Sequence, residues 1–256
     1  MVRSARWCRR GPGKDVTGAP THAGALVELR AVTVVYPDGT VGLSEADFRL
    51  DAGELVVVSG PSGAGKSTLL AAISGRLPAS VGSVLLDGAE AASMGAAELA
   101  AWRRSTAFVA QGAPMLERRT VAENVAYAVE IARPDVHDCR SVAQDVLEGL
   151  GIGETGDRRP SELSGGQRQR AALAQALAKA PVALFVDEPT ANLDPRTAAQ
   201  VVAVIASHCQ DRMACVVASH HDAQFALSSA RRLWVSDGRL GAVPSRSYET
   251  LTDVGP

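Results

Sequence analysis

Alternation of apolar and polar residues predicts strands at the start of the regular part of the chain. From Leu26 to Val35 the two kinds of residue alternate, as in a strand with one buried face, and Tyr36-Pro37-Asp38-Gly39 follows with the chemistry of a turn. A second strand is expected from Ala46 to Leu50. Leu55 to Val58 is continuously apolar, which is typical of a strand covered on both faces.

Helical spacing dominates the middle of the chain, and we expect residues 95–165 to form a helical lobe. Breaks that carry Gly and Pro separate its predicted helices, which are Glu98–Arg104, Val121–Ile131 and Val142–Leu150. An Ala-rich helix is predicted over residues 164–179, and Pro181 stops it.

Strands and helices alternate again towards the C-terminus. Strand-like runs occur at Val182–Val186, Ala214–Ala218 and Leu233–Val235, with a predicted helix, Pro195–Ser207, between the first two. A short helix, Leu69–Ser74, likewise follows one of the early strands. This alternation predicts an α/β fold with a mostly parallel sheet, into which the helical lobe is inserted.

Composition indicates a folded protein and argues against nucleic acid as a partner. The 256 residues are 46% hydrophobic and 21% charged, which provides ample apolar surface to bury. The formal net charge is −2, whereas a nucleic-acid-binding domain is normally basic, so we expect no nucleic-acid partner. The four cysteines form no CxxC pair and fit reduced thiols in the cytosol better than disulfides or a zinc site.

Neither a membrane span nor a secretory signal is predicted. The most apolar stretch, residues 171–186, is interrupted by Gln, Lys and Pro and falls short of the roughly 20 residues that a span needs. The basic N-terminus lacks the apolar core of a secretory signal. We expect a flexible N-terminal tail over residues 1–24, one domain over 25–243 and a C-terminal tail over 244–256.

A glycine-rich segment, GPSGAGKST, matches the phosphate-binding pattern GxxxxGK[ST]. Its glycines let successive backbone N–H groups turn towards phosphate oxygens. Lys66 can reach the β- and γ-phosphates, and the hydroxyl of Ser67 can ligate Mg²⁺. A chance glycine-rich turn is the alternative, and the predicted strand before and helix after the segment disfavour it. The candidate nucleotide-binding residues here are Gly60, Pro61, Ser62, Gly63, Ala64, Gly65, Lys66, Ser67 and Thr68.

The apolar strand Val182–Val186 ends in two acids, Asp187 and Glu188. In a phosphate-binding α/β protein, Asp187 can hold Mg²⁺ through water. Glu188 could polarise an attacking water as a general base. An acidic pair at a strand end is by itself more often a solvated turn, and the glycine-rich segment makes the nucleotide interpretation the stronger one.

The segment Leu163-Ser164-Gly165-Gly166-Gln167 begins the Ala-rich helix. Ser164 is a good N-cap residue, and the two glycines would let an anion approach the helix N-terminus. Taken alone, these residues favour an ordinary capped helix. We call Leu163–Gln167 the signature segment.

Together with Gln111, Asn192-Leu193-Asp194 and His220, these motifs occur in the order typical of ABC ATPases. Over about residues 26–240 the chain therefore resembles the nucleotide-binding subunit of an ABC transporter. The resemblance implies a P-loop NTPase fold of the ABC type, with a mostly parallel sheet, an antiparallel β lobe and an inserted α-helical lobe. Residues 98–111 and 120–125 further resemble the ATPases of lipoprotein-release and macrolide-export systems, which favours export or membrane extraction.

The resemblance also implies roles at the site. Tyr36 corresponds to the aromatic residue that stacks on adenine, although a core or edge-strand tyrosine is the alternative. His220 corresponds to a histidine that contacts the γ-phosphate, with the adjacent His221 as the alternative. The implied catalytic residues are Glu188, His220 and Gln111; the implied Mg²⁺ contacts are Ser67, Gln111 and Asp187; and the implied contacts to nucleotide across a dimer are Ser164, Gly165, Gly166, Gln167 and Asp194.

ATP and Mg²⁺ are the ligands that the resemblance implies. It further implies a head-to-tail dimer, in which the P-loop of one copy faces the signature segment of the other, and an integral membrane permease as partner. The expected location is cytoplasmic, peripheral on the inner face of the cell membrane. A soluble ABC-type ATPase acting on DNA or as a scaffold is the alternative, which the lack of a coiled-coil insertion between Ser67 and Leu163 disfavours.

Overall fold

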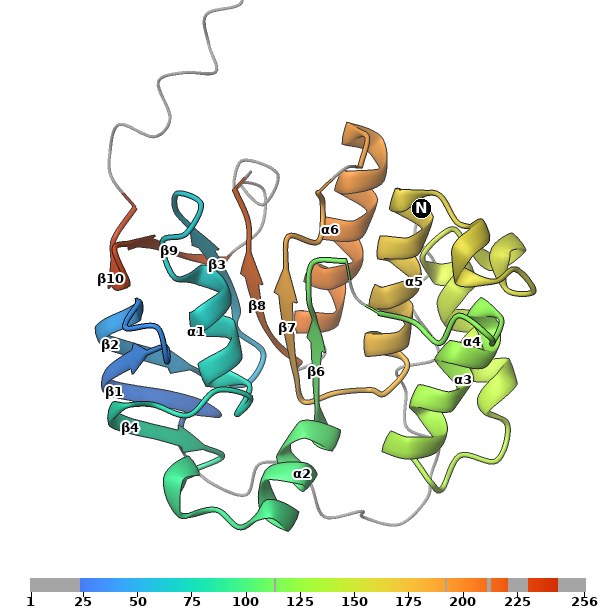
Figure 1. The fold of residues 1–256 in the computed structure, drawn as a ribbon. Helices are drawn as coiled ribbons and strands as arrows, with labels where there is room; N and C mark the ends of the chain where they lie inside the picture. Colours follow the sequence, from blue (N-terminus) through green and yellow to red (C-terminus); the bar gives the residue numbers. More distant parts are fainter. Residues whose placement is uncertain (1–23, 113, 192, 211–212, 221–229, 244–256) are drawn as a thin grey trace, which may run out of the picture.

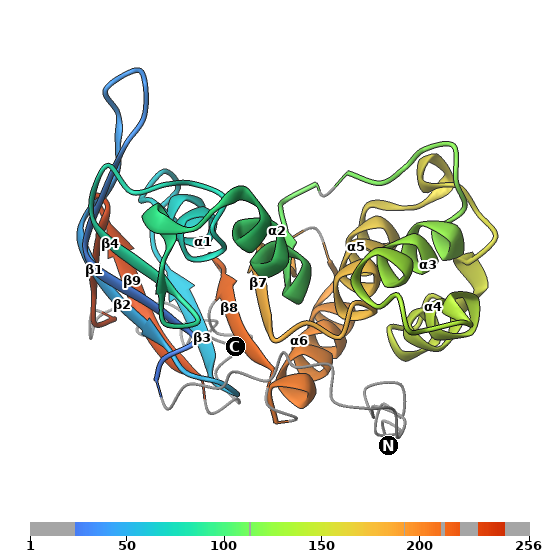
Figure 2. The same cartoon turned by 90° about the horizontal axis from the view of Figure 1, so that it is seen from below.

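A six-stranded sheet forms the centre of the molecule, and a four-stranded sheet lies to one side of it (Figure 1). The computed structural model describes residues 24–112, 114–191, 193–210, 213–220 and 230–243. Helices α3, α4 and α5 gather on the side of the central sheet opposite the small sheet, as the second view shows (Figure 2).

The central sheet has the strand order β10-β9-β3-β8-β7-β6. All of its described pairings are parallel except that of β9 with β10. Every residue of β3, β7 and β8 is buried, as the continuously apolar runs predict for strands covered on both faces. The predicted α/β fold with a mostly parallel sheet is therefore confirmed. The strands are β3 (Leu55–Ser59), β6 (Thr106–Val109), β7 (Ala183–Asp187), β8 (Ala214–Ala218), β9 (Arg231–Ser236) and β10 (Arg239–Gly241).

The small sheet is antiparallel, with the order β2-β1-β4-β5. Its strands are β1 (Val27–Val35), β2 (Val41–Leu50), β4 (Val81–Leu86) and β5 (Ala89–Glu90). Strand β2 begins earlier than the sequence predicts, because it pairs with β1 from Val41 onwards. Strands β4 and β5 were not predicted. Gly82 weakens the local strand signal of β4, and pairing with the distant β1 supplies the missing stabilisation.

The helices carry the capping chemistry that their sequences suggest. Thr120 accepts a hydrogen bond from the backbone N–H of Glu123 and begins α3 with a capping box. Asp138 accepts from the N–H of Ser141 at the start of α4. The helices are α1 (Lys66–Ile73), α2 (Ala96–Ser105), α3 (Val121–Ala132), α4 (Cys139–Gly149), α5 (Gly165–Leu177) and α6 (Pro195–Gln210).

One segment of the expected helical lobe belongs to the central sheet instead. Residues 106–109 form β6, which pairs in parallel with β7 at the sheet edge. A four-residue apolar run cannot be assigned to a strand or a helix by its spacing alone, and pairing with β7 decides the outcome. The range 95–165 is therefore not helical throughout.

The central sheet separates two hydrophobic cores. Along β7, Leu184 and Val186 pack into the core shared with α3, α4 and α5, whereas Ala183 and Phe185 pack into the core shared with α1 and the small sheet. This alternation follows from the two-residue period of a strand. Each half of the molecule thus has an apolar interior of its own.

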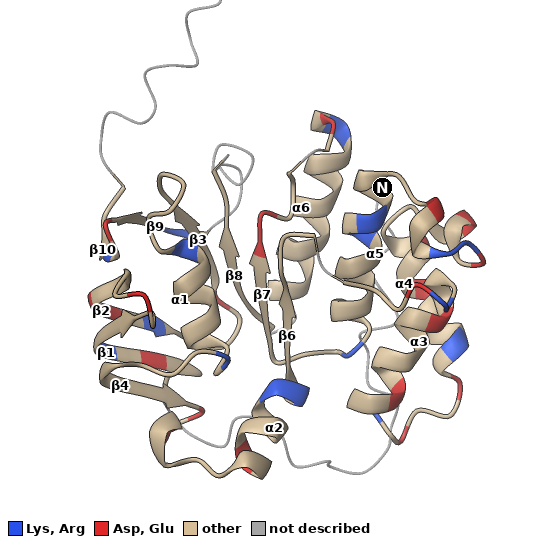
Figure 3. Ribbon diagram, in the orientation of Figure 1, with Lys and Arg blue, Asp and Glu red and all other residues tan. Residues whose placement is uncertain are grey.

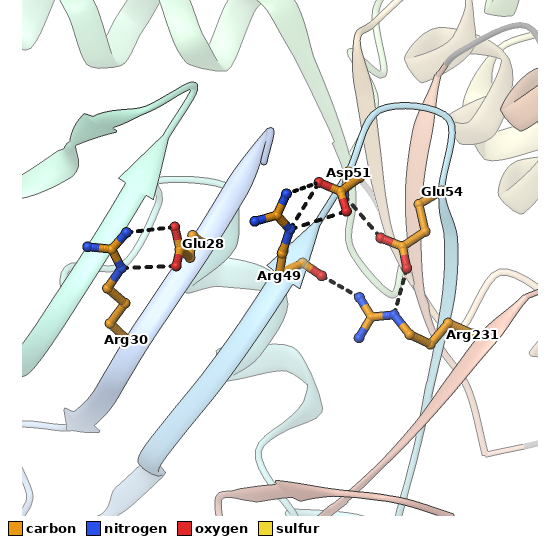
Figure 4. A network of polar contacts seen from close by, with 6 residues as sticks. All are labelled: Glu28, Arg30, Arg49, Asp51, Glu54 and Arg231. Atoms are coloured by element: carbon orange, nitrogen blue, oxygen red, sulfur yellow. Dashed lines mark hydrogen bonds and ion pairs between the residues drawn. The ribbon is translucent and has the colours of Figure 1, made fainter. Parts of the chain in front are cut away.

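Polar contacts connect the small sheet to the central one (Figure 4). The Arg231 side chain at the start of β9 pairs with Glu54 at 2.6 Å and donates to the backbone carbonyl of Arg49 in β2. Arg49 in turn pairs with Asp51 at 2.9 Å. Exposed pairs of this kind contribute little to the free energy of folding.

In the part of the chain that the structure describes, none of the helices has the length and apolar character required to cross a bilayer.

Lys179 connects the end of α5 to the start of β6. Its ammonium group donates to the carbonyl of Arg103 at 3.3 Å and to the carbonyl of Thr106. Burial, with repulsion from Arg76 as the smaller cause, lowers the pKa of Lys179 to about 8, from an ordinary value of 10.5. Between these two values the unfolded chain binds the proton that the folded chain has released. The free energy of unfolding should therefore rise with pH over this window.

We expect this rise to disappear in Lys179→Met. The free energy of unfolding of the wild type, minus that of the variant, should increase between pH 8 and pH 10.5 and stay level below pH 8. Urea unfolding at pH 7, 8, 9 and 10.5 measures both proteins, and the difference cancels the other titrating groups. A constant difference across the whole range would show that Lys179 keeps its ordinary pKa.

Candidate active site

The candidate site forms where four parallel strands end at the same edge of the central sheet. Neighbouring strands are in register there, with Val109 of β6 opposite Val186 of β7, and Asp187 opposite Ala218 of β8. In open α/β sheets ligands bind outside the carboxyl ends of the strands. Basic colour at the start of α1 and acidic colour at the end of β7 lie at this edge (Figure 3). The segments that follow the strands are Gly60–Thr68 after β3, Gln111 after β6, Asp187–Glu188 at the end of β7 and His220 after β8.

The backbone of the glycine-rich segment requires glycine at two positions. Gly60 has a φ of +152°, and a Cβ there would lie 2.1 Å from the carbonyl oxygen of Val235. Gly65 has a φ of +109°, and its Cβ would lie 2.2 Å from the carbonyl oxygen of Gly42. No side chain in the described structure caps the N-terminus of α1 at Gly65. The N–H groups of the first turn of α1 can therefore donate to an anion, such as a phosphate.

Lys66 is buried at the centre of this cradle. Its Nζ donates to the carbonyl oxygens of Gly60 and Pro61, each at 2.8 Å. Burial lowers the pKa of Lys66, and the negative charges of Glu188 and Asp187 oppose that shift. A buried ammonium group with flexible donors is suited to hold phosphate oxygens.

Ser67 and Asp187 join the segment to β7. The Ser67 hydroxyl donates to Oδ2 of Asp187 at 2.6 Å, and Asp187 is buried. A hydroxyl and a carboxylate oxygen side by side are ligands that suit Mg²⁺, which commonly uses few protein ligands beside water and phosphate. The described residues contain no cluster of three or more His, Cys, Asp or Glu that could hold a metal by itself.

Glu188 has both a strained backbone and a poorly solvated carboxylate. Its φ is +50°, a region that residues other than glycine rarely adopt. Its backbone N–H donates to the carbonyl of Ala218 at 2.9 Å. Its Oε1 is buried and accepts no hydrogen bond from the described residues, and the imidazole Nε2 of His220 lies 3.4 Å away. The unsatisfied oxygen can accept a hydrogen bond from a bound water.

His220 lies between the carboxylate and the ammonium group. Its backbone N–H contacts Oε2 of Glu188 at 3.4 Å, and its ring nitrogens lie 3.4 Å from Nζ of Lys66. The alternative residue, His221, lies outside the described residues, as does Asn192.

Two further residues lie at the same site. Gln111 is exposed two residues after the end of β6, the edge strand that pairs with β7 as far as Val109 and Val186. The hydroxyl of Tyr36 is 2.9 Å from that of Thr68, so the tyrosine is held against the start of α1. No local sequence pattern predicts this last contact, because it joins residues 32 positions apart.

The signature segment lies apart from the glycine-rich segment of the same chain. Helix α5 lies beyond β7 and β6 as seen from α1 (Figure 1). No hydrogen bond or ion pair between described residues joins 163–167 to 60–68. Ser164 caps α5 by accepting from the N–H of Gln167 at 3.2 Å, and Ser164 and Gly165 are exposed. The predicted N-cap is thus confirmed.

Asp194 comes directly before α6 and caps it. Its Oδ1 accepts from the backbone N–H groups of Arg196 and Thr197, each at 3.1 Å. Hydrogen bonds from the side chain and backbone of Thr197 are the main causes that lower the pKa of Asp194. The carboxylate is exposed and available to a second molecule.

The chain is similar to the ATP-binding proteins of several transporters. Residues 43–191 match the family described as ABC transporter. A phosphonates import ATP-binding protein, PhnC, of Chromohalobacter salexigens is 36% identical over 81% of this chain and 79% of its own length. A methionine import ATP-binding protein, MetN, of Corynebacterium efficiens is 33% identical over 91% of this chain and 66% of its own. A macrolide export ATP-binding/permease protein, MacB, of Paracoccus denitrificans is 36% identical over 94% of this chain, which spans 36% of that protein.

Solved structures show the same fold. The dimeric bacterial ABC transporter cassette MJ0796 has a TM-score of 0.79 and 28% identity, over 84% of this chain and 96% of its own. A dimeric post-hydrolysis state of the same cassette, bound to ADP and Pi, also has a TM-score of 0.79 and 28% identity, and is matched over 99% of its length.

The first substitution that tests the site is Lys66→Ala. Removing the buried ammonium group should weaken ATP binding at least tenfold, about 1.4 kcal/mol, because the remaining donors are neutral backbone N–H groups. Titration with a fluorescent ATP analogue measures the affinity. Lys179→Met is the matched control, since it removes the other described lysine far from this edge. Equal affinity of Lys66→Ala and the wild type would show that phosphate binds elsewhere.

Proposed function

The chain belongs to the ABC transporter family as its ATP-binding and ATP-hydrolysing component, and we propose that it powers export or membrane extraction through a permease partner. The observation that carries the ATP-hydrolysing role is that a buried lysine, a Ser–Asp pair and a glutamate with an unsatisfied oxygen lie at one edge of the central sheet, where β3 and β7 end. Phosphoryl transfer to water requires a cation at the phosphates, ligands for a metal ion and a group that positions or activates the water. The lysine, the Ser–Asp pair and the glutamate can supply these three functions.

ATP binding is assigned to the glycine-rich segment. In this proposal Lys66 and the backbone N–H groups of residues 60–68 bind the phosphates, and Tyr36 stacks on the adenine. Ser67 and Asp187 would hold Mg²⁺, with Gln111 as a further contact. The 2.6 Å contact between Ser67 and Asp187 supports this assignment, because it brings two suitable oxygens together. When bound, Mg²⁺ neutralises charge on the phosphates.

Glu188 is assigned as the general base for the attacking water. Its buried Oε1, which lacks a hydrogen bond from the described residues, supports this role. His220 is assigned to the γ-phosphate and, through its contacts with Glu188 and Lys66, helps to orient both groups. Gln111 is assigned to orient the water from the neighbouring strand end.

A head-to-tail dimer would complete each site. Ser164, Gly165, Gly166 and Gln167 of one copy would contact the γ-phosphate held by the other, and Asp194 would cross the interface. Two observations support this arrangement. Ser164 and Gly165 are exposed and the signature segment lies apart from the glycine-rich segment of its own chain, and the similar cassette MJ0796 was solved as a dimer. A two-fold axis would then give two equivalent sites.

The proposed membrane partner would dock near the loop that follows Gln111. In that loop Met115 is buried, whereas Leu116 is 45% exposed. Leu116 and the exposed Tyr127 and Ile131 of α3 provide an apolar surface for a permease. Docking there would keep the chain at the cytoplasmic face of the membrane.

Export or extraction is the proposed direction, and uptake is the second candidate. The resemblance of residues 98–111 and 120–125 to macrolide-export ATPases supports export, and the macrolide export protein MacB is among the similar proteins. The names of PhnC and MetN, which are import proteins, favour uptake. Transport by the purified complex in vesicles of defined orientation decides between the two directions.

The proposed base is tested by Glu188→Gln. We expect ATP binding to persist and the hydrolysis rate to fall by about 10²–10⁴-fold, because the amide cannot accept the proton of the water. The uncleaved nucleotide should then hold the dimer together, which size-exclusion chromatography with ATP detects. Glu130→Gln, the same change on the exposed face of α3, is the control. Wild-type turnover in Glu188→Gln would remove Glu188 from the role of base.

The proposed partner is tested by purification from membranes. We expect a polytopic membrane protein to copurify with the tagged chain and to be identified by mass spectrometry. Leu116→Asp should reduce its yield several-fold, because a charge would replace an exposed apolar contact. Val81→Asp, at a residue that is 65% exposed on the small sheet, should not. Recovery of DNA or DNA-bound proteins in place of a membrane protein would favour the soluble ATPase alternative.

A further inference from the structure

Helix α5 contacts the candidate base of its own chain as well as carrying the signature segment. Gln169, half-buried in the second turn of α5, points its side-chain amide at the carbonyl oxygen of Glu188, with Nε2 at 3.5 Å. Next to this contact, Gly166 packs so closely against Leu193 that a Cβ would lie 2.9 Å from its methyl group. The start of α5 is therefore packed against the segment that runs from Glu188 to α6.

The backbone of Glu188 needs such support. Its positive φ is sparsely populated for a residue with a side chain, so it persists only where the surroundings hold it. The N–H of Glu188 is held by the carbonyl of Ala218 at 2.9 Å. The carbonyl of Glu188 accepts from the N–H of Ala191 at 3.2 Å and from Gln169. Gln169 is the side chain among these contacts, and a substitution can remove it without changing the backbone.

We propose that Gln169 is a positioning residue for ATP hydrolysis, which fixes the Glu188 backbone and so aims the carboxylate at the attacking water. The proposal rests on the assignment of Glu188 as the base. Rotation of the peptide that follows Glu188 would turn the residue away from His220, which contacts both of its carboxylate oxygens at 3.4 Å. A small misplacement of a catalytic group costs much of its rate advantage.

The neighbouring residue extends the same connection to the loop after Gln111. Arg168 pairs with Glu117 of that loop at 3.0 Å and donates to the carbonyl of Pro160 at 2.6 Å. Two successive residues of α5 thus make these contacts: Arg168 pairs with the loop after Gln111, and Gln169 donates to the carbonyl of Glu188. A nucleotide that is bound by the partner copy and contacts the signature segment of this copy would in this way influence the position of Glu188 in this copy.

The test is Gln169→Glu, which keeps the size of the side chain but replaces the amide donor by a carboxylate that repels the Glu188 carbonyl. We expect kcat to fall at least about tenfold. The KM for ATP, ATP-dependent dimerisation and the melting temperature should match those of the control. Gln175→Glu is that control, because Gln175 is a half-buried glutamine further along α5 and no hydrogen bond between described residues involves its side chain. Gln169→Ala, which removes the donor without adding charge, should lower kcat in the same way but by less.

A double variant separates positioning from a structural role. If Gln169 acts through Glu188, then Gln169→Glu combined with Glu188→Gln should hydrolyse ATP no more slowly than Glu188→Gln alone. An additional loss in the double variant would overturn the proposal. So would a kcat equal to that of Gln175→Glu, or a lower melting temperature and higher KM in both Gln169 variants.

Glu188→Gln measured alone separates a failure of the base assignment from a failure of the positioning role of Gln169. Wild-type turnover in that variant removes the base assignment, and with it the proposal for Gln169. An inactive Glu188→Gln beside a fully active Gln169→Glu overturns only the positioning role.

Discussion

The parallel pairing of β3, β8, β7 and β6 is the constraint on which the candidate site depends. The buried strands β3, β8 and β7, paired in register, bring a lysine, two carboxylates and a histidine that are up to 154 residues apart within hydrogen-bond range of one another. Shifting β7 by one residue would exchange its two apolar faces, so the hydrophobic cores also fix the position of Asp187 and Glu188. The packing that stabilises the sheet therefore also sets the geometry of the site.

Within the site, the polar groups that would bind phosphate already form hydrogen bonds with one another and with the backbone. Lys66 is held by two carbonyl oxygens, and Ser67 is held by Asp187. A phosphate would offer Lys66 oxygen acceptors in place of the carbonyls, so little solvation would be lost on binding. Glu188 differs, because one oxygen of its buried carboxylate accepts no hydrogen bond from the described residues. That oxygen of Glu188 can accept a hydrogen bond from a water, whereas Lys66 and Ser67 already have protein partners.

Local chemistry could be predicted from the sequence, whereas long-range pairing could not. The glycine-rich segment, the acids after β7 and the cap at Ser164 each depend on a few adjacent residues, and the structure has them where they were expected. Strands β4 and β6 are short, and pairing with distant strands decides their conformation. The contacts of Tyr36 with Thr68 and of Gln169 with Glu188 join residues on different elements. No local sequence pattern can therefore predict them. Residues 106–109 were expected in the helical lobe for the same reason, because their pairing with β7 is long-range.

The two separate cores have a consequence for how such a protein can diversify. The helices α3 and α4 share their apolar interior with α5 and one face of the sheet, while α1 packs on the other face. Exposed residues of α3, such as Tyr127 and Ile131, can be exchanged without repacking the interior beneath the phosphate cradle. Evolution can therefore change the surface that recognises a partner protein without changing the site that binds ATP.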